Sequence, residues 1–402
     1  MRKTLLATTA FVGVAFAGAA HAAPASPISL NVGGYTDFVA GFYHEAEGTS
    51  ANGARANHDF ETEAKLNFDA TGKAANGVEY GANIGLWNGS EAGTLWGNGG
   101  TSFTLNSGYV WLSGAFGKVL LGDEHGASDL FVYAPTVGEG QVDGRYTDFV
   151  DQHTLAFFQA SGIDNTEHST KVTYYTPKVG NETHKVQLGI SFIPTLYDYG
   201  QSVNNYKNGA GTSKISPYVD VIKSALQYTG KYGKVDVTAS AQLIAGSHSN
   251  ETGTVLFGGS SGVAGTARDF TSYGFGTQVG YNGWTFGGSY TDLGHYNEVA
   301  SQGKSQETYS GGAKYEFDKV AVAANYLGGK GYVNYLQTTA GTAPSAANAY
   351  VGSFNSYGTG AAYTWFPGLT SNIDGVLFAQ KSGVTTDHDD GYVVLVSQKL
   401  AF

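Results

Sequence analysis

The sequence predicts an all-β fold, a 16-stranded antiparallel transmembrane β-barrel. Side chains alternate between apolar and polar along many short segments, and the connections between these segments alternate between short and long. The composition is rich in glycine and tyrosine (59 and 27 of 402 residues), which suits strands joined by tight turns. A period of two places one apolar face on each strand, and this pattern with tight turns at one end is typical of membrane barrels.

The first 22 residues predict a secretory signal peptide. Arg2 and Lys3 form a short basic region, and an uncharged apolar segment follows from Leu5 to Ala19. Ala20-His21-Ala22 then places small residues where a signal peptidase cleaves. The alternative is a retained membrane anchor, but the apolar segment is shorter than the roughly 20 residues of a spanning helix. We therefore expect an exported chain with one barrel domain over residues 23–402.

Composition and charge exclude several functions. Beyond the signal peptide, 20 basic residues stand against 33 acidic ones, whereas a nucleic-acid partner would favour a basic face. The sequence has no cysteine, which rules out disulfides and thiolate metal sites. The acidic excess indicates either a solvated surface or an acidic lumen.

The segment from Asp59 to Asp69 shows the alternation most clearly. Apolar or small residues alternate with acidic, basic and amide residues over eleven positions. A helix would mix these two sets on every side, so the segment is predicted as a strand. Sixteen such segments are predicted, at residues 28–43, 59–69, 77–88, 102–113, 117–123, 168–176, 184–193, 217–229, 233–244, 268–281, 283–293, 305–317, 319–327, 354–365, 370–380 and 390–402.

The connections and the strand ends favour a membrane barrel over a soluble β-sandwich, which would also alternate. Short turns such as Tyr281-Asn282-Gly283 alternate with long connections such as 124–167 through eight hairpins. Aromatic residues end strand after strand, where the interfacial girdles of a membrane barrel belong. These residues are Tyr228, Trp284, Tyr290, Tyr315, Phe317, Tyr326, Tyr363 and Trp365.

Three stretches of this chain resemble the Gram-negative general porins, with the alphaproteobacterial branch the most similar. Val110–Gly122 is similar to the family's strand-turn-strand before loop 3, with a glycine pair around an aromatic turn. Ser169–Pro177 is similar to the strand that follows loop 3 and ends in Tyr-Thr-Pro. The chain ends in Phe402 behind an alternating segment, as outer-membrane proteins do for barrel assembly. Over the rest of the chain, the likeness lies in the predicted order of strands, short turns and long loops.

The resemblance implies a homotrimer in the lipid of the bacterial outer membrane that passes small hydrophilic solutes. It further implies short periplasmic turns, long extracellular loops, and a third long loop, here Asp123 to about Glu167, that folds into the barrel and narrows the pore. Phe402 would then engage the barrel assembly machinery after export through the periplasm. The charged residues of the predicted constriction are Glu124, Asp129, Glu139, Asp143, Arg145, Asp148 and Asp151.

The predicted lumen wall departs from the family pattern, in which an acidic loop faces a ladder of basic residues. The first four strands contain no arginine and are rich in carboxylates. We expect mild cation selectivity, because carboxylates around an aqueous pore attract cations. The alternative is that many of them lie at the mouth, paired or screened. The predicted wall residues are Asp37, Asp59, Glu61, Glu63, Lys65, Glu79, Lys171, Lys185, Lys223 and Lys314.

No catalytic or metal-binding constellation is evident, and we expect neither an enzyme nor a cofactor. The ten histidines are scattered and form no zinc motif. Asp387–Gly391 could ligate Ca²⁺ but also suits a solvated hairpin loop. Two other functions stay open, a channel specific for a sugar or an ion, and a plugged structural or adhesive barrel. The inward faces read from the sequence are charged, which argues against a plug.

Overall fold

The computed structural model describes residues 27–46, 56–88, 103–138, 144–150, 169–196, 218–248, 253–255, 263–265, 268–296, 306–333, 350–381 and 388–402. The predicted signal peptide lies outside these residues. The strands are β1 Ser29–Ala46, β2 His58–Lys73, β3 Glu79–Trp87, β4 Thr104–Gly114, β5 Gly117–Asp123, β6 Thr170–Tyr175, β7 Val179–Gly180, β8 His184–Thr195, β9 Tyr218–Tyr232, β10 Val235–His248, β11 Gly253–Val255, β12 Val263–Gly265, β13 Phe270–Tyr281, β14 Trp284–Asp292, β15 Glu307–Phe317, β16 Val320–Val333, β17 Tyr350–Phe366, β18 Leu369–Lys381 and β19 His388–Ala401.

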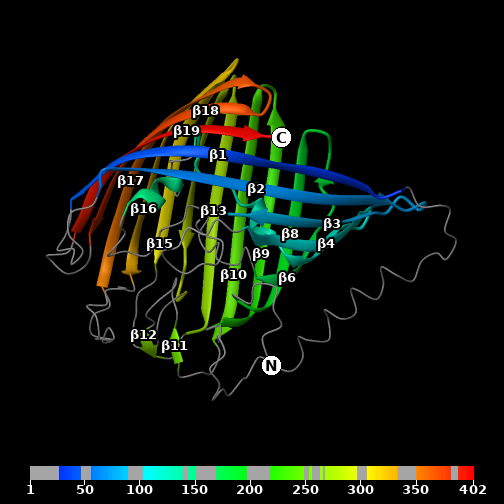
Figure 1. Ribbon diagram of the computed structural model, residues 1–402. Helices are drawn as coiled ribbons and strands as arrows, with labels where there is room; N and C mark the ends of the chain where they lie inside the picture. Colours follow the sequence, from blue (N-terminus) through cyan, green and yellow to red (C-terminus); the bar gives the residue numbers. More distant parts are fainter. Residues whose placement is uncertain are drawn as a thin grey trace.

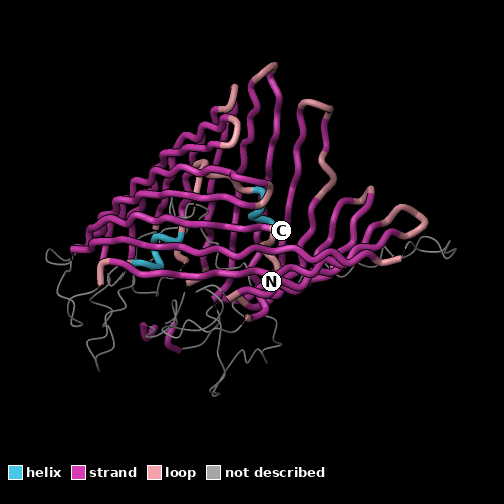
Figure 2. The backbone as a smooth tube through the Cα atoms, turned by 45° about the horizontal axis from the view of Figure 1, so that its top comes forward, coloured by secondary structure: helices cyan, strands magenta, loops and turns pink. Residues whose placement is uncertain are grey.

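One antiparallel sheet closes on itself to form the barrel (Figures 1 and 2). Consecutive strands pair along the chain, and β1 pairs with β19, so that Tyr35 lies opposite Ala401. The sheet has 17 strands, but β6 and β7 both pair with β8 and form one interrupted wall strand. The structure therefore confirms the predicted barrel of sixteen wall strands. In the described part of the chain, no helix has the length and hydropathy needed to cross a bilayer.

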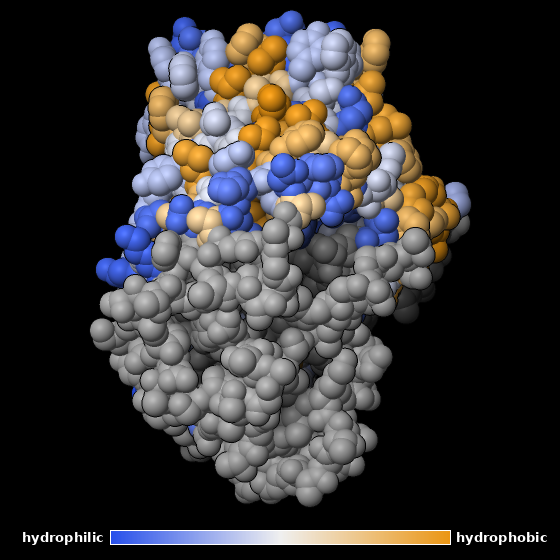
Figure 3. All heavy atoms as spheres, turned by 60° about the vertical axis from the view of Figure 1, so that its left-hand side comes forward, coloured by the Kyte–Doolittle hydropathy of each residue, from blue (hydrophilic) through white to orange (hydrophobic). Residues whose placement is uncertain are grey.

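The outer face of the barrel is apolar, as the alternation predicts. On β1, Phe38 and Phe42 are about half exposed, whereas their neighbours Asp37 and Val39 are buried inside the barrel. Figure 3 shows hydrophobic side chains spread over the outer wall on the side that lies to the left in Figure 1. Because side chains that face lipid must be apolar, this outer wall suits a bilayer.

The short turns carry the residues that their geometry needs. Tyr281 pairs directly with Trp284, which leaves Asn282 and Gly283 as a two-residue hairpin loop. Both have positive φ, 49° and 85°, and this twist matches the right-handed twist of the flanking strands. Asparagine and glycine adopt this conformation with little strain, so the turn between β13 and β14 follows from the local sequence.

Two 3-10 turns lie in the described part of the third long connection, which we call loop 3. They are η1, Ala127–Leu130, and η2, Arg145–Phe149. The sequence predicts an irregular loop here, and the two turns are a difference that the structure adds. Both place side chains against the inner wall, because Ala127, Leu130, Tyr146 and Phe149 are buried.

The inward faces are not charged throughout, contrary to the prediction. Toward the long-loop end, β1 and β16 to β19 carry apolar inward residues that pack against loop 3, and this group is the loop-3 cluster. Its members are Val39, Tyr43, Ala134, Tyr146, Phe149, Val150, Leu327, Phe354, Val376, Phe378, Val393 and Leu395. A second inward group, at the long-loop ends of β8 to β10, β13 and β14, consists of Ile193, Leu196, Tyr218, Val221, Ile244, Phe270, Leu293 and Tyr296. A two-residue period shows which side chains face the inside of the barrel but not which segment packs on them. The sequence alone therefore does not identify these apolar groups.

Aromatic side chains form two outward rows on β13 to β19. At the short-turn end, Trp284 lies 4.7 Å from Tyr315, and Tyr363 lies 4.6 Å from Trp365, measured between ring centroids. Nearer the long loops, a row of tyrosines crosses the strands, one per strand on β13 to β17 and again on β19. They are Tyr273, Tyr290, Tyr309, Tyr326, Tyr357 and Tyr392. Two aromatic rows at two heights are typical of a wall that crosses two lipid interfaces.

Candidate functional site

Loop 3 begins by running along the inner wall, and polar wall side chains hold its backbone. The Ala127 N–H donates to Ser191 Oγ on β8 at 2.8 Å, and Gln227 Nε2 on β9 donates to the Leu130 carbonyl at 2.8 Å. Backbone groups taken out of water need partners, and these side chains supply them.

The same pattern continues around the barrel. The Val132 N–H donates to Ser240 Oγ on β10 at 2.9 Å, and the Ala134 N–H donates to Ser310 Oγ on β15 at 3.1 Å. Between them, Gln278 Nε2 on β13 donates to the Tyr133 carbonyl at 2.8 Å. The first arm of the loop thus crosses the inward faces from β8 to β15.

Close approach to β13 requires a glycine. A Cβ placed on Gly276 would lie 1.7 Å from the carbonyl oxygen of Val132, which no side chain could tolerate. Further along, a Cβ on Gly138 would lie 2.1 Å from the carboxylate of Asp374, a buried residue of β18. These two glycines bring the loop backbone directly onto the wall.

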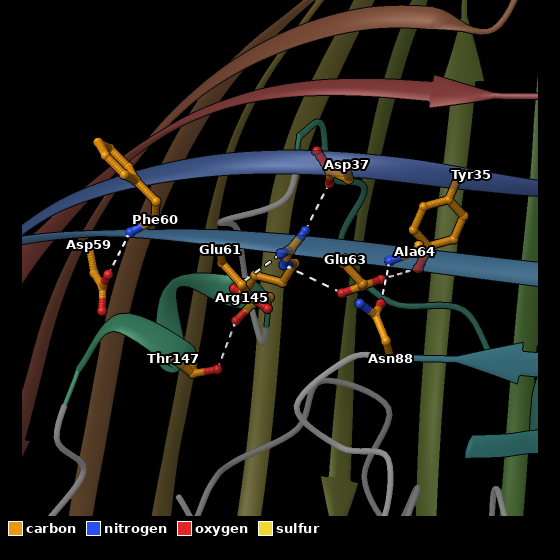
Figure 4. A network of polar contacts seen from close by, with 11 residues as sticks. Tyr35, Asp37, Asp59, Phe60, Glu61, Glu63, Ala64, Asn88, Arg145 and Thr147 are labelled. Atoms are coloured by element: carbon orange, nitrogen blue, oxygen red, sulfur yellow. Dashed lines mark hydrogen bonds and ion pairs between the residues drawn. The ribbon is translucent and has the colours of Figure 1, made fainter. Parts of the chain in front are cut away.

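In the described part of the second arm, an arginine binds the wall. Arg145, the first residue of η2, places its guanidinium among three carboxylates of β1 and β2 (Figure 4). Nη1 lies 2.8 Å from Asp37 Oδ2, Nη2 lies 3.0 Å from Glu61 Oε2, and Nε lies 3.6 Å from Glu63 Oε2. Tyr35 also donates its hydroxyl hydrogen to Glu63. We call Arg145, Asp37, Glu61 and Glu63 the arginine clasp.

The clasp is largely withdrawn from water. The side chain of Arg145 is 13% exposed, and those of Asp37 and Glu63 are 0% and 8% exposed. Burial alone would lower the pKa of Arg145, but the attraction of Glu61, Glu63 and Asp37 outweighs it, so the pKa lies above the ordinary arginine value. Arg145 therefore stays charged at every physiological pH.

A polar cavity of about 570 Å³ lies between the start of loop 3 and the wall from β2 to β8. Two lysines and three carboxylates line it, together with amide, hydroxyl, imidazole and aromatic groups. The lining residues are Lys65, Asn67, Asp69, Asn83, Asn106, Ser107, Tyr109, Lys118, Leu120, Glu124, His125, Asp129, Leu130, Tyr175 and Gln187.

Side-chain hydrogen bonds organise the wall of this cavity. Asn83 Nδ2 donates to Asp69 Oδ1 at 2.7 Å, and Ser107 Oγ donates to Asn83 Oδ1 at 2.7 Å. Where loop 3 begins, the Tyr175 hydroxyl donates to the Gly126 carbonyl at 2.5 Å. The cavity can therefore exchange hydrogen bonds with polar solutes and hydrated ions, and its fixed charges are negative in sum.

The predicted loop residues take different places. Glu124 is buried and accepts the Gly126 N–H at 2.8 Å, and Asp129 lines the cavity. Arg145 forms the clasp, and the charge of Asp148 on the same turn acts on Glu61. Glu139, Asp143 and Asp151 lie outside the described residues.

The predicted wall lysines are not equivalent. Lys171 and Lys223 are 2% and 0% exposed, and Lys171 donates to the backbone carbonyl of Glu124 at the start of loop 3. Lys185 is exposed, and Lys314 lies 3.2 Å from Glu316. Only Lys65 of the predicted lysines lines the cavity.

The predicted wall carboxylates also divide into groups. Asp37, Glu61 and Glu63 belong to the clasp, whereas Asp59 is exposed on the same strand face of β2. Glu79 lies at the short-turn end of β3, 3.1 Å from Lys73. Of these residues, the clasp carboxylates are those that Arg145, in the described part of loop 3, reaches.

Several cavity residues were not proposed from the sequence, notably Tyr109, Lys118 and His125. Tyr109 could have been found, because it shares a strand face with Trp111 and Ser113. His125 carried no signal, since its position depends on the path of the loop. Among the described residues no cluster of acidic or histidine side chains is arranged to hold a metal ion. Asp387, in the considered Ca²⁺ segment, lies outside the described residues.

Comparisons with known proteins agree with the fold. A family model described as Gram-negative porin matches residues 7–383. Among solved structures, a porin refined at 1.8 Å aligns with a TM-score of 0.52, 15% identity, and coverage of 93% of this chain and 100% of its own. An anion-selective porin from Comamonas acidovorans aligns at 0.56 with 14% identity, over 93% and 100% of the two chains. In-vitro folded OmpT of Vibrio cholerae, in a trimer form, aligns at 0.55 with 12% identity, over 94% and 100%. No curated protein matches the chain.

Proposed function

Because the chain belongs to the Gram-negative porin family, we propose that it is a water-filled channel through which small hydrophilic solutes and ions diffuse passively, with a mild preference for cations. Family and fold support an outer-membrane channel. Passage needs an aqueous path with polar walls, and the cavity beside loop 3 has such walls.

The balance of fixed charge carries the cation preference. In the cavity, Lys65 and Lys118 stand against Asp69, Glu124 and Asp129. In the clasp, Arg145 stands against Asp37, Glu61 and Glu63. Both groups are negative in sum, and a negative wall raises the local concentration of cations within about 8 Å at physiological salt.

We propose that the protein acts as a homotrimer, with the long loops outside the cell and the short turns in the periplasm. The short strands β3 to β6, of 9, 11, 7 and 6 residues, carry aliphatic outward side chains such as Ile84, Val110 and Leu121. Among the described residues, the tyrosine row is restricted to β13 to β19. An aliphatic face without that row suits contact with another subunit, and the tyrosine face suits lipid headgroups.

The proposal includes a route to the outer membrane. The signal peptide is removed on export, and the assembly machinery then recognises Phe402. The Phe402 side chain is 63% exposed, while its N–H donates to the Gly34 carbonyl at 3.0 Å and its carbonyl accepts the Gly34 N–H at 2.9 Å. The main chain thus closes the barrel, and the ring stays free for recognition before insertion.

The test is reconstitution of refolded residues 23–402 in a planar bilayer under a KCl gradient. Stepwise currents with a reversal potential that favours K⁺ are expected. Steps that favour Cl⁻ would keep the channel but contradict the cation preference, and would point to Lys65 and Lys118 as the dominant charges.

Two other functions give different outcomes in the same experiment. A plugged barrel would insert, resist unfolding and pass no current, and the apolar residues inside the barrel make this comparison necessary. A sugar-specific channel would conduct ions and be blocked by a sugar, since Tyr109 and Tyr175 offer aromatic faces in the cavity. A general channel is expected to show no saturable block by any of a panel of mono- and disaccharides.

A further inference from the structure

The clasp reverses the polarity that the resemblance implies. In the general porins that the chain resembles, an acidic loop faces basic residues of the wall. In this protein, a basic residue of loop 3 faces an acidic part of the wall. The guanidinium reaches carboxylates on two strands, Asp37 of β1 and Glu61 and Glu63 of β2. Arginine suits this role because its fork of donors is planar and permanently charged.

The pairing changes how these carboxylates act on passing ions. Asp37 and Glu63 are almost completely buried, and Glu61 is 23% exposed. The guanidinium offsets one of the three carboxylate charges, so the clasp presents a smaller negative charge to a passing ion than its carboxylates would alone. The wall is therefore less acidic to an ion than its sequence indicates.

The packing of η2 depends on the same residue. Tyr146 and Phe149, next to Arg145, are buried in the loop-3 cluster, with Phe149 6.3 Å from Tyr43 and Tyr146 6.4 Å from Phe378 between ring centroids. Apolar packing alone would bring η2 against these carboxylates without the positive charge of Arg145, and carboxylates held away from water are stabilised by a paired cation. Arg145 supplies such a charge from the same turn that carries the apolar contacts.

We propose that Arg145 is the specificity-determining and positioning residue of the channel, because it masks the carboxylates of Asp37, Glu61 and Glu63 and thereby limits its cation preference. This inference rests on the proposed channel function. It assigns the degree of ion selectivity to one residue of loop 3, rather than to the summed charge of the lumen.

The experiment compares the full-length mature wild type with Arg145→Gln, Arg145→Lys and Lys231→Gln in planar bilayers under a KCl gradient. Lys231 is the matched control, because its loss removes the same charge from an exposed site 3.9 Å from Asp236 at the short-turn end of β9. Arg145→Gln should raise the K⁺ to Cl⁻ permeability ratio about 1.5- to 2-fold, the size expected for one screened charge about 10 Å from the ion path. Lys231→Gln should leave the ratio unchanged.

A second variant separates masking from simple addition of charge. Glu61→Gln is made in the wild type and in Arg145→Gln, since Glu61 is the most exposed carboxylate of the clasp. Its effect on the permeability ratio should be larger in the Arg145→Gln background, where Glu61 is unmasked. Equal effects in both backgrounds would overturn the proposal, as would an unchanged ratio in Arg145→Gln.

Folding of each variant is checked by the shift of the folded band on heating before electrophoresis. If Arg145→Gln does not fold, Arg145→Lys decides, because a lysine pairs as a point charge and cannot reach all three carboxylates. Its ratio should lie above that of the wild type, and an unchanged ratio overturns the proposal. A wild type that inserts without conducting overturns the proposed function and this inference together, whereas a conducting wild type with an unchanged variant overturns this inference alone.

Discussion

At the scale of single residues, the path of loop 3 depends on small and polar positions of the wall. Ser191, Ser240 and Ser310 accept its N–H groups, and Gly276 leaves room for the Val132 carbonyl. On β13, Gly274 also faces loop 3, because a Cβ placed on Gly274 would lie 3.2 Å from the Phe131 ring. These glycines lie in a strand, where they weaken the sheet slightly but allow close backbone approach.

Gly276→Val should displace loop 3 from β13, because its Cβ would overlap the Val132 carbonyl oxygen at 1.7 Å. Overpacking of this kind costs about 1–3 kcal/mol, and we expect altered single-channel conductance and a lower unfolding temperature. Gly311→Val on β15 is the matched control, because a built Cβ there has open space. A conductance that is the same in wild type and Gly276→Val would show that the loop does not bear on the pore at this point.

The pKa of Asp269, before β13, lies below its ordinary value because the His248 backbone N–H and then the His248 ring donate to it. A lowered pKa contributes stability above the ordinary carboxyl value of about 3.9, and this contribution is lost as pH falls through the lowered value. In His248→Ala the ring bond disappears and the backbone bond remains, so the pKa should rise only part of the way. Titration of labelled aspartate carboxyls by NMR in detergent measures both values. A full return to about 3.9 in the variant would assign the shift to the ring alone.

At the scale of elements, local rules explain most strands and turns. Alternation sets the face of each strand, and Asn282-Gly283 sets the hairpin between β13 and β14. The last strand, β19, is different because its partner β1 lies at the other end of the chain. Closure therefore depends on non-local pairing, including the two hydrogen bonds between Phe402 and Gly34.

Phe402→Ala should reduce the amount of barrel assembled in cells without preventing refolding in detergent. The ring is exposed, whereas the closing hydrogen bonds come from the main chain. Phe317→Ala, at the short-turn end of β15 and 47% exposed, is the matched control. Folded protein in membranes and refolding yield in vitro are both measured. Equal losses of the two variants in cells would contradict a special role for the terminal aromatic ring.

At the scale of the whole molecule, the barrel differs from side to side, both inside and outside. Inside, the loop-3 cluster occupies the wall of β1 and β16 to β19, and the polar cavity lies toward β2 to β8. Outside, the tyrosine row follows β13 to β19, and aliphatic residues cover β3 to β6. The proposed path for ions and the proposed subunit contact therefore lie on the same side of the barrel.

Val110→Arg should abolish the proposed trimer, whereas Ile373→Arg should not. Both side chains face outward, 52% and 54% exposed, and each lies four residues from the short-turn end of its strand, β4 or β18. An arginine facing lipid at mid-depth costs about 2–4 kcal/mol in either place, so a difference between the variants reports on subunit contact. Native mass spectrometry or cross-linking of detergent-solubilised protein gives the oligomeric state. Trimers of both variants would move the contact away from β3 to β6.

The sequence by itself determined the sixteen strands, their facing and the short turns, because alternation and turn chemistry act between neighbours along the chain. It also indicated the family, and with it the outer membrane. Only the tertiary structure decided which charges reach the lumen. Arg145 meets Asp37, 108 residues away, while Lys171 and Lys223 are buried away from water. A period of two assigns a residue to the inner face, but whether water, an ion pair or an apolar cluster covers it depends on contacts between distant segments.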